Sequence, residues 1–193
     1  MRMRFPCLTH LALIAAVAAC SFSSRVAAQT PKASAHSSAP VGDTQVTRAI
    51  RRTLDSLYEA FSFTAGGTPD WAAMRVLFLP GAAFVDPVKP DSPPGAIGAD
   101  MFLKNFRQWV ERTPKGKAGF RERIVAARID HFGRVAHAYV AFEGYAPGKT
   151  TAEERGVDSI QLVLDGAQWK VASFTTQYEE AGLAMPARFL GRR

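Results

Sequence analysis

The spacing of hydrophobic residues changes midway along the chain, and this change predicts the architecture. Over residues 44–61, 70–78 and 98–112, apolar side chains recur every three or four positions, which is typical of helices with one buried face. From residue 120 to residue 178, apolar and polar positions alternate in four runs separated by turns, which is typical of strands. The order predicts an α+β fold, a strongly bent antiparallel sheet packed on three N-terminal helices.

Asp86 is the first candidate for chemistry because a short apolar strand, residues 82–86, ends there. Pro87 follows directly and stops the strand, so Asp86 lies where a buried strand meets a loop. The loop of residues 87–96 contains four prolines, so we expect a stiff loop that serves as a rim or lid beside Asp86. A carboxylate in this position suits a general base that faces a pocket, although an aspartate before proline also commonly caps a turn.

Composition and charge narrow the class of protein. The chain has 193 residues, of which 47% are hydrophobic and 21% charged, as in one soluble globular domain with a real core. Its net charge of +7 falls to +4 without residues 1–28, which carry three arginines and no acidic residue. Such a diffuse charge, with no aromatic-and-basic motif, argues against nucleic acid as a partner.

The N-terminal region predicts export. Residues 1–28 combine a basic start, a short apolar segment at 11–19 and small side chains before Gln29, as in a bacterial signal peptide. The apolar segment is too short for a transmembrane helix. Residues 17–20 also resemble a lipobox, so lipidation of Cys20 and membrane anchoring are the alternative to a periplasmic or secreted protein. A flexible spacer at 29–42, a domain at 43–182 and a C-terminal tail at 183–193 complete the predicted organisation.

Three segments resemble the nuclear transport factor 2-like superfamily, also called SnoaL-like or ketosteroid isomerase-like. They are the helix around Leu57-Tyr58-Glu59-Ala60-Phe61, the strand end Phe84-Val85-Asp86-Pro87-Val88, and the closing hairpin of residues 156–171 with its Asp165-Gly166 turn. The likeness covers residues 44–180 and implies a cone, in which a bent sheet wraps around long helices and leaves a cavity at the open end. Residues 131–133 and 155–162 look like those of exported bacterial members without an assigned reaction.

The resemblance also implies a catalytic trio. In ketosteroid isomerase an aspartate base works with a tyrosine and a protonated aspartic acid that stabilise the enolate, a known system. The matching positions here are Asp86 as base, with Tyr58 and Asp158 as oxyanion donors. Each has a plainer alternative: Tyr58 can simply fill the cone, and Asp158 can pair with Arg155, which would keep it ionised.

Two hypotheses follow, and neither calls for a cofactor. The first is a small-molecule binding protein with an apolar pocket. The second is an isomerase, lyase or cyclase that uses Asp86 as its general base. His131 and His137 have no metal-ligand spacing, so we expect no metal. If the even-numbered residues of strand 135–143 face the pocket, His137 and Tyr139 face the other side, which would suit a homodimer. The expected ligand contacts are Phe61, Trp71, Phe106, Trp109, Val140, Phe142 and Gln177.

Overall fold

The computed structural model describes residues 41–85 and 93–190, with side chains from residue 44 onward. These residues belong to one compact unit that spans Ser38–Arg193. Asp86 lies outside the described residues, and so do the predicted signal peptide with Cys20, most of the spacer, and residues 191–193.

Five helical segments occur in the described part of the chain. They are α1 (Val41–Phe61), α2 (Trp71–Val76), α3 (Ala99–Arg112), α4 (Pro114–Ala118) and the short 3₁₀ helix η1 (Ala187–Phe189). The side chain of Asp70 caps α2 by accepting from the Ala73 amide at 2.9 Å. Thr113 caps α4 in the same way, by accepting from the Gly116 amide at 2.9 Å.

One six-stranded sheet confirms the predicted α+β class. Its strands are β1 (Phe78–Val85), β2 (Ala96–Gly98), β3 (Arg121–Phe132), β4 (Val135–Tyr145), β5 (Glu154–Asp165) and β6 (Gln168–Tyr178). The order across the sheet is β2-β1-β6-β5-β4-β3. Strands β3 to β6 form the expected antiparallel meander. Strand β1 pairs in parallel with β6, and the short edge strand β2 pairs antiparallel with β1.

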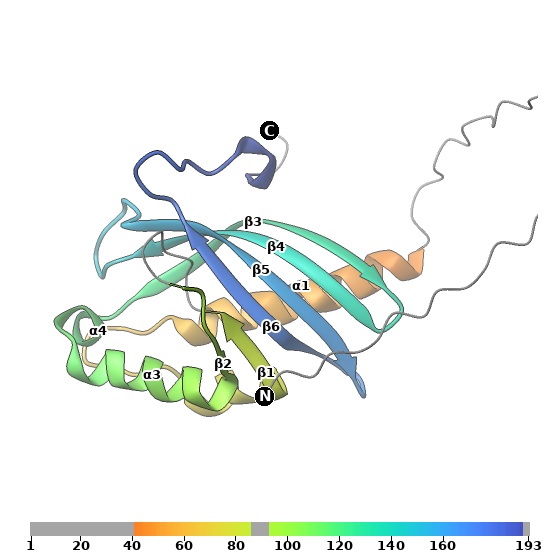
Figure 1. Ribbon diagram of the computed structural model, residues 1–193, viewed down its shortest axis with the longest axis horizontal. Coiled ribbons are helices and arrows are strands. Elements are labelled where there is room, and N and C mark those ends of the chain that lie inside the picture. Colours follow the sequence, from red (N-terminus) through yellow and green to blue (C-terminus); the bar gives the residue numbers. More distant parts are fainter. Residues whose placement is uncertain (1–40, 86–92, 191–193) are drawn as a thin grey trace, which may run out of the picture. The chain divides into compact units, whose positions relative to one another are not determined.

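The sheet curves around α1, and the core lies between them (Figure 1). α1 packs against β3 and β6, and α3 packs against β1. Ile50, Leu54 and Leu57 on α1 are completely buried, as their spacing predicts. This packing sets the inward face of the strands, from which the site residues project.

The described strands pair with three register shifts, and the two within the meander of β3 to β6 change which residues face inward. One lies in β3 between Ile124 and Ala126, and the other lies where β5 pairs with β6, between Gln161 and Leu162. A bulge adds a residue to one strand and reverses the alternation beyond it. In β6 the buried positions accordingly change from Trp169 and Val171 to Phe174 and Thr176.

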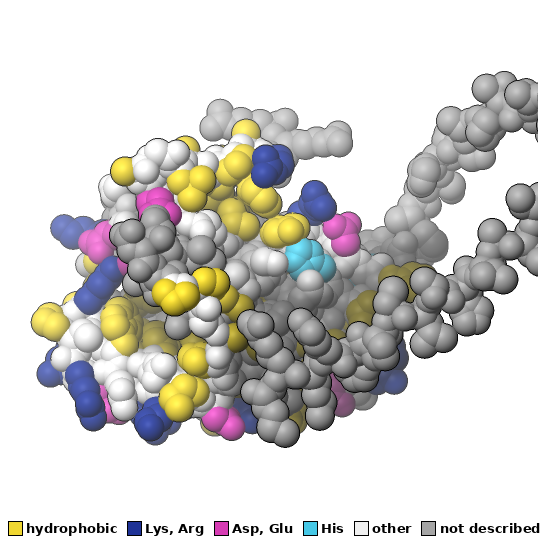
Figure 2. Space-filling model, in the orientation of Figure 1, with side chains coloured by type: hydrophobic (Ala, Val, Ile, Leu, Met, Phe, Trp, Pro, Cys, Tyr) yellow, Lys and Arg dark blue, Asp and Glu magenta, His cyan; other side chains and the backbone are white. Residues whose placement is uncertain are grey.

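The C-terminal segment lies against the outer face of the sheet. Phe189 contacts Tyr139 with ring centroids 5.5 Å apart, and the Met185 amide donates to Glu179 Oε1 at 2.6 Å. Figure 2 shows hydrophobic side chains gathered around this segment. Ala136, Ala138, Val140 and Phe142 belong to the core, and Tyr139 lies on the opposite face, as the alternation in β4 predicts.

None of the helices in the described ranges is long and apolar enough to cross a membrane.

Candidate functional site

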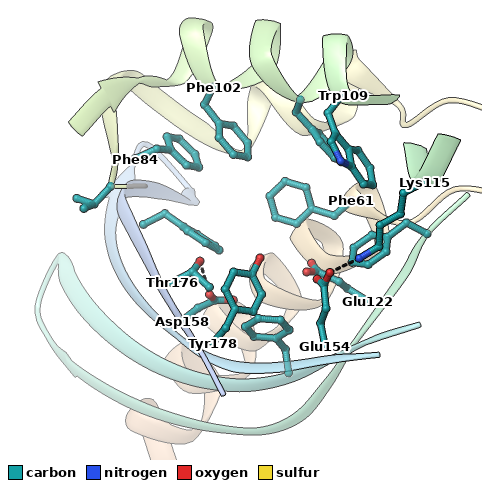
Figure 3. Close-up of a pocket in the computed structure, with 15 residues that line it drawn as sticks. Phe61, Phe84, Phe102, Trp109, Lys115, Glu122, Glu154, Asp158, Thr176 and Tyr178 are labelled. Carbon is teal, nitrogen blue, oxygen red and sulfur yellow. Dashed lines mark hydrogen bonds and ion pairs between the residues drawn. The ribbon is translucent and has the colours of Figure 1, made fainter. Parts of the chain in front are cut away.

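A cavity of about 300 Å³ lies between the concave face of the sheet and α3 (Figure 3). All four strands of the meander contribute to it, together with α1, β1, α3 and α4. Its lining residues are Phe61, Phe84, Val85, Phe102, Phe106, Trp109, Lys115, Phe120, Glu122, Phe142, Glu154, Asp158, Phe174, Thr176 and Tyr178.

The wall of the cavity is a continuous set of aromatic rings. Phe84 stacks on Phe102 with centroids 4.0 Å apart, and Phe106 stacks on Trp109 with centroids 5.7 Å apart. Phe61 meets Phe102, Phe106 and other rings edge-on, which joins the two stacks. Such a wall offers a large apolar surface with well-defined ring orientations.

Asp158 is the most constrained polar group of the cavity. It is only 2% exposed, and its two carboxyl oxygens have separate partners. The phenol of Tyr58 donates to Oδ2, and the hydroxyl of Thr176 donates to Oδ1 at 2.7 Å. Arg155 pairs with Glu143 and Glu179 instead, so the alternative in which it holds Asp158 ionised does not apply.

Burial governs the protonation of the Asp158 carboxyl. Loss of water raises the pKa of Asp158 to about 7, although the hydrogen bonds from Tyr58 and Thr176 favour the ionised form. Burial, with the charge of Asp158 beside it, raises the pKa of the Tyr58 phenol well above its ordinary value. Asp158 can therefore gain or lose a proton near neutral pH, while Tyr58 stays protonated.

Glu122 and Tyr178 form a second polar group in the cavity. Burial, together with the charges of Asp158 and Glu154, raises the pKa of the Glu122 carboxyl well above its ordinary value. Burial and the neighbouring carboxylates also raise the pKa of Tyr178. In Figure 3 the Tyr178 hydroxyl points into the cavity. Because the charges of Glu122 and Asp158 repel each other in one apolar space, a state in which one of the two carboxyl groups is protonated is favoured.

Lys115 and Glu154 complete the polar lining as an ion pair. Both side chains are partly exposed, at 47% and 30% respectively, so this pair is closer to solvent than Asp158. It links α4 to the start of β5.

Five of the ten predicted site residues line the cavity. They are Phe61, Phe106, Trp109, Phe142 and Asp158. Tyr58 is 3% exposed and lies behind the lining, where its phenol bonds to Asp158 and its ring packs against Phe61 and Phe142.

Three predicted ligand contacts lie elsewhere. Val140 is completely buried in the core, and Trp71 packs behind Phe106 with the Arg107 guanidinium over its ring. Gln177 lines a separate hollow on the outer face of the sheet, and its amide donates to the carbonyl of Tyr178 at 3.0 Å. Counting every second residue from Val171 predicts that Gln177 faces the cavity. The bulge in the β5–β6 pairing reverses the alternation after Val171, so Gln177 faces the outer side of the sheet instead.

Sequence reasoning missed most of the polar lining. Lys115, Glu122, Glu154, Thr176 and Tyr178 were not predicted to face a cavity. For Glu122 a signal did exist, since it is two positions from the apolar Ile124 on a strand and so shares its face. No group of three or more His, Cys, Asp or Glu residues in the described ranges is arranged to hold a metal ion.

Comparison with known proteins identifies the fold. No protein-family model matches the sequence, and no curated protein matches it. Among solved structures, a candidate dehydratase of the nuclear transport factor 2-like family from Streptomyces avermitilis is similar, with a TM-score of 0.56 and 16% identity, over 73% of this chain and 100% of that one.

Two further solved structures agree with this fold. A candidate aromatic ring hydroxylase from Novosphingobium aromaticivorans has a TM-score of 0.54 and 16% identity, over 75% of this chain and 94% of that one. A protein of unknown function with a cystatin-like fold from Nostoc punctiforme has a TM-score of 0.54 and 10% identity, over 69% of this chain and 90% of that one. The chain therefore has the nuclear transport factor 2-like fold that the sequence resemblance implied.

Proposed function

We propose that this domain binds a small, mostly apolar molecule in the aromatic cavity. The observation that carries the proposal is the composition of the lining, in which aromatic rings form the wall and a few polar groups converge from β3, β5 and β6. Binding sites for small molecules have this character, because apolar walls supply affinity and a few polar groups supply orientation. The volume of about 300 Å³ suits a compact ligand of one or two rings.

Native mass spectrometry of the protein, purified from its own host, tests this proposal. A retained small molecule that is lost on denaturation would support it, and its mass would give the ligand class. A titration with phenylpropanol, a neutral aromatic probe, provides a second measurement. If no molecule is retained and the probe does not bind, the proposal fails.

Proton transfer next to a carbonyl is a second candidate function. The supporting observation is that Asp158 faces the cavity with a pKa of about 7, so that it can donate a hydrogen bond to a substrate oxygen. Tyr58 already donates to Asp158, so it acts as a positioning residue behind the donor rather than as a second oxyanion donor. Asp86 remains the proposed base.

Exchange of deuterium into a bound enolisable ketone, followed by NMR, measures this activity directly. The Asp86→Asn variant should abolish exchange and leave affinity for the ketone largely intact, because the amide keeps the shape and removes the base. Asp130→Asn, an exposed position on β3, is the matched control. Exchange that persists in Asp86→Asn would remove Asp86 from the mechanism.

Export is part of the proposal and rests on the leader sequence. The basic start, the short apolar segment and the small residues before Gln29 support cleavage by signal peptidase. The mass of the mature chain distinguishes a start at Gln29 from a lipidated Cys20. A homodimer, which the outer face of the sheet would provide, is tested in the same spectrum.

A further inference from the structure

We propose that the cavity selects a protonated amine, a molecule with an apolar body whose ammonium group binds at Glu122. The inference rests on the proposed small-molecule binding and adds the chemical class of the ligand. It depends on three features of the lining: the charge balance, the Glu122 carboxyl, to which no described side chain donates a hydrogen bond, and the aromatic wall.

The charge balance favours a cation. The cavity is lined by three carboxyl groups, Asp158, Glu122 and Glu154, and by Lys115 as the single cationic side chain among the described lining residues. The Lys115 ammonium is already paired with Glu154. A carboxylate ligand would add a further negative charge beside the acidic groups, which is unfavourable where water is scarce.

Glu122 is the acidic group that is left to meet the ligand. Its backbone amide is held by Ser62, which accepts at 3.0 Å, so the residue is fixed in place at the start of β3. No side chain in the described part of the chain donates a hydrogen bond to its carboxyl group. Asp158, in contrast, has both of its oxygens occupied by Tyr58 and Thr176. An ammonium group at Glu122 would supply the missing donors and form a charge-assisted hydrogen bond.

The aromatic wall strengthens the preference for a cation. Phe61 and Trp109 point into the same cavity as Glu122 (Figure 3). The faces of such rings carry partial negative charge and attract an ammonium group, most strongly where water is excluded. An anion gains nothing from these faces, and a neutral hydroxyl gains only a hydrogen bond.

Proton release should accompany this binding. In the empty cavity, burial and the nearby carboxyls Asp158 and Glu154 raise the pKa of Glu122, which favours its neutral form. A bound ammonium stabilises the ionised form and lowers that pKa again. Lys115 and Tyr178 also face this region, but Lys115 is paired and Tyr178 is held protonated by a raised pKa. Affinity for the amine should therefore rise with pH until the amine itself loses its proton.

The test compares three probes that share one body: phenylpropylamine, phenylpropanol and phenylpropanoate. Isothermal titration calorimetry near neutral pH should show the amine binding about tenfold tighter than the alcohol, and the carboxylate weakest. Repeating the amine titration in two buffers with different ionisation enthalpies counts the protons released on the wild-type protein. The Glu122→Gln variant should remove the preference for the amine and keep affinity for the alcohol. Glu111→Gln, an exposed position on α3, should keep the preference.

Each outcome decides one point. Equal affinity for amine and alcohol, or amine binding without proton release, would overturn this inference and leave the proposed small-molecule binding intact. Failure of all three probes to bind would overturn this inference, and it would overturn the proposed binding as well if the purified protein also retains no molecule. If Glu122→Gln does not fold, the ranking of the probes and the proton count on the wild-type protein still decide the outcome.

Discussion

The phenol of Tyr58 on α1 donates a hydrogen bond to the carboxyl of Asp158 on β5, a hundred residues later in the chain. Both side chains are almost fully buried, at 3% and 2% exposure. The bond joins the central helix to the middle of the sheet and sets the position of the carboxyl that faces the cavity. A single contact therefore serves both the packing of the domain and the chemistry of its site.

Tyr58→Phe should destabilise the domain by about 1–3 kcal/mol, because one oxygen of a buried carboxyl loses its donor while the ring packing remains. Phe142 and Phe61 contact the ring at centroid distances of 6.4 and 6.5 Å, and these contacts do not need the hydroxyl. Loss of the donor should also raise the pKa of Asp158 further, since the bond favours the ionised form. Urea unfolding measures the first effect, and NMR titration of the Asp158 carboxyl carbon measures the second. Tyr139→Phe, on the outer face, should leave that pKa unchanged.

Asp158 should also make the stability of the domain depend on pH. Its pKa is about 7 in the folded protein and near 3.8 in the unfolded chain, so between these values the folded state binds more protons. The stabilisation is complete below about pH 4 and is lost as the pH rises through about 7, by up to about 1.4 kcal/mol per pH unit.

Asp158→Asn should flatten this dependence, because the amide stays neutral at every pH and can still accept from Tyr58. Unfolding free energies at several pH values test the prediction, with the exposed Asp130→Asn as control. A slope that does not differ between the wild type and Asp158→Asn would contradict it. Glu122 contributes with the same sign, so a smaller slope should remain.

The fold could be predicted from the sequence because local patterns and global packing agree. The meander of β3 to β6 follows the alternation of its residues, and the Asp165-Gly166 turn lies where β5 ends and β6 begins. The aromatic cavity was also foreseen in part, since Phe61 and Phe106 lie on the apolar faces of helices whose spacing is regular.

The polar part of the site was harder to predict, because a shift in strand register decides which side chains of β6 face the cavity. A bulge leaves no distinctive residue pattern, yet it moves every later side chain to the other face. In β6 this places Tyr178 in the cavity and Gln177 outside it, the opposite of the count from Val171. Trp71 shows a second limit of prediction from sequence. Its position on the helix indicates that the ring is buried, but whether the ring lines the cavity or packs behind Phe106 depends on how α2 packs against α3.

The three tryptophans should report differently on ligand binding. Trp109 lines the cavity, Trp71 lies behind Phe106, and Trp169 is buried at the other end of β6, where its carbonyl accepts from Thr53. Phenylpropanol should change the fluorescence of the wild type and of Trp169→Phe. Trp109→Phe should lose most of the change while calorimetry still detects binding. A full signal in Trp109→Phe would mean that the probe binds elsewhere, for example in the hollow that contains Gln177.

Gly156→Ala should disturb the site through its wall. Gly156 lies on β5 opposite Phe142, and a Cβ atom there would be 2.7 Å from two ring carbons of Phe142 and 2.7 Å from the carbonyl oxygen of Gln177. The ring can turn, but the backbone oxygen of a paired strand cannot, so we expect a loss of about 1–3 kcal/mol in stability and weaker ligand binding. Gly98→Ala is the matched control, because its Cβ would meet no atom within 4 Å. Equal stabilities of the two variants in urea would show that β5 and β6 can separate slightly here, and that Gly156 is not needed for the shape of the cavity.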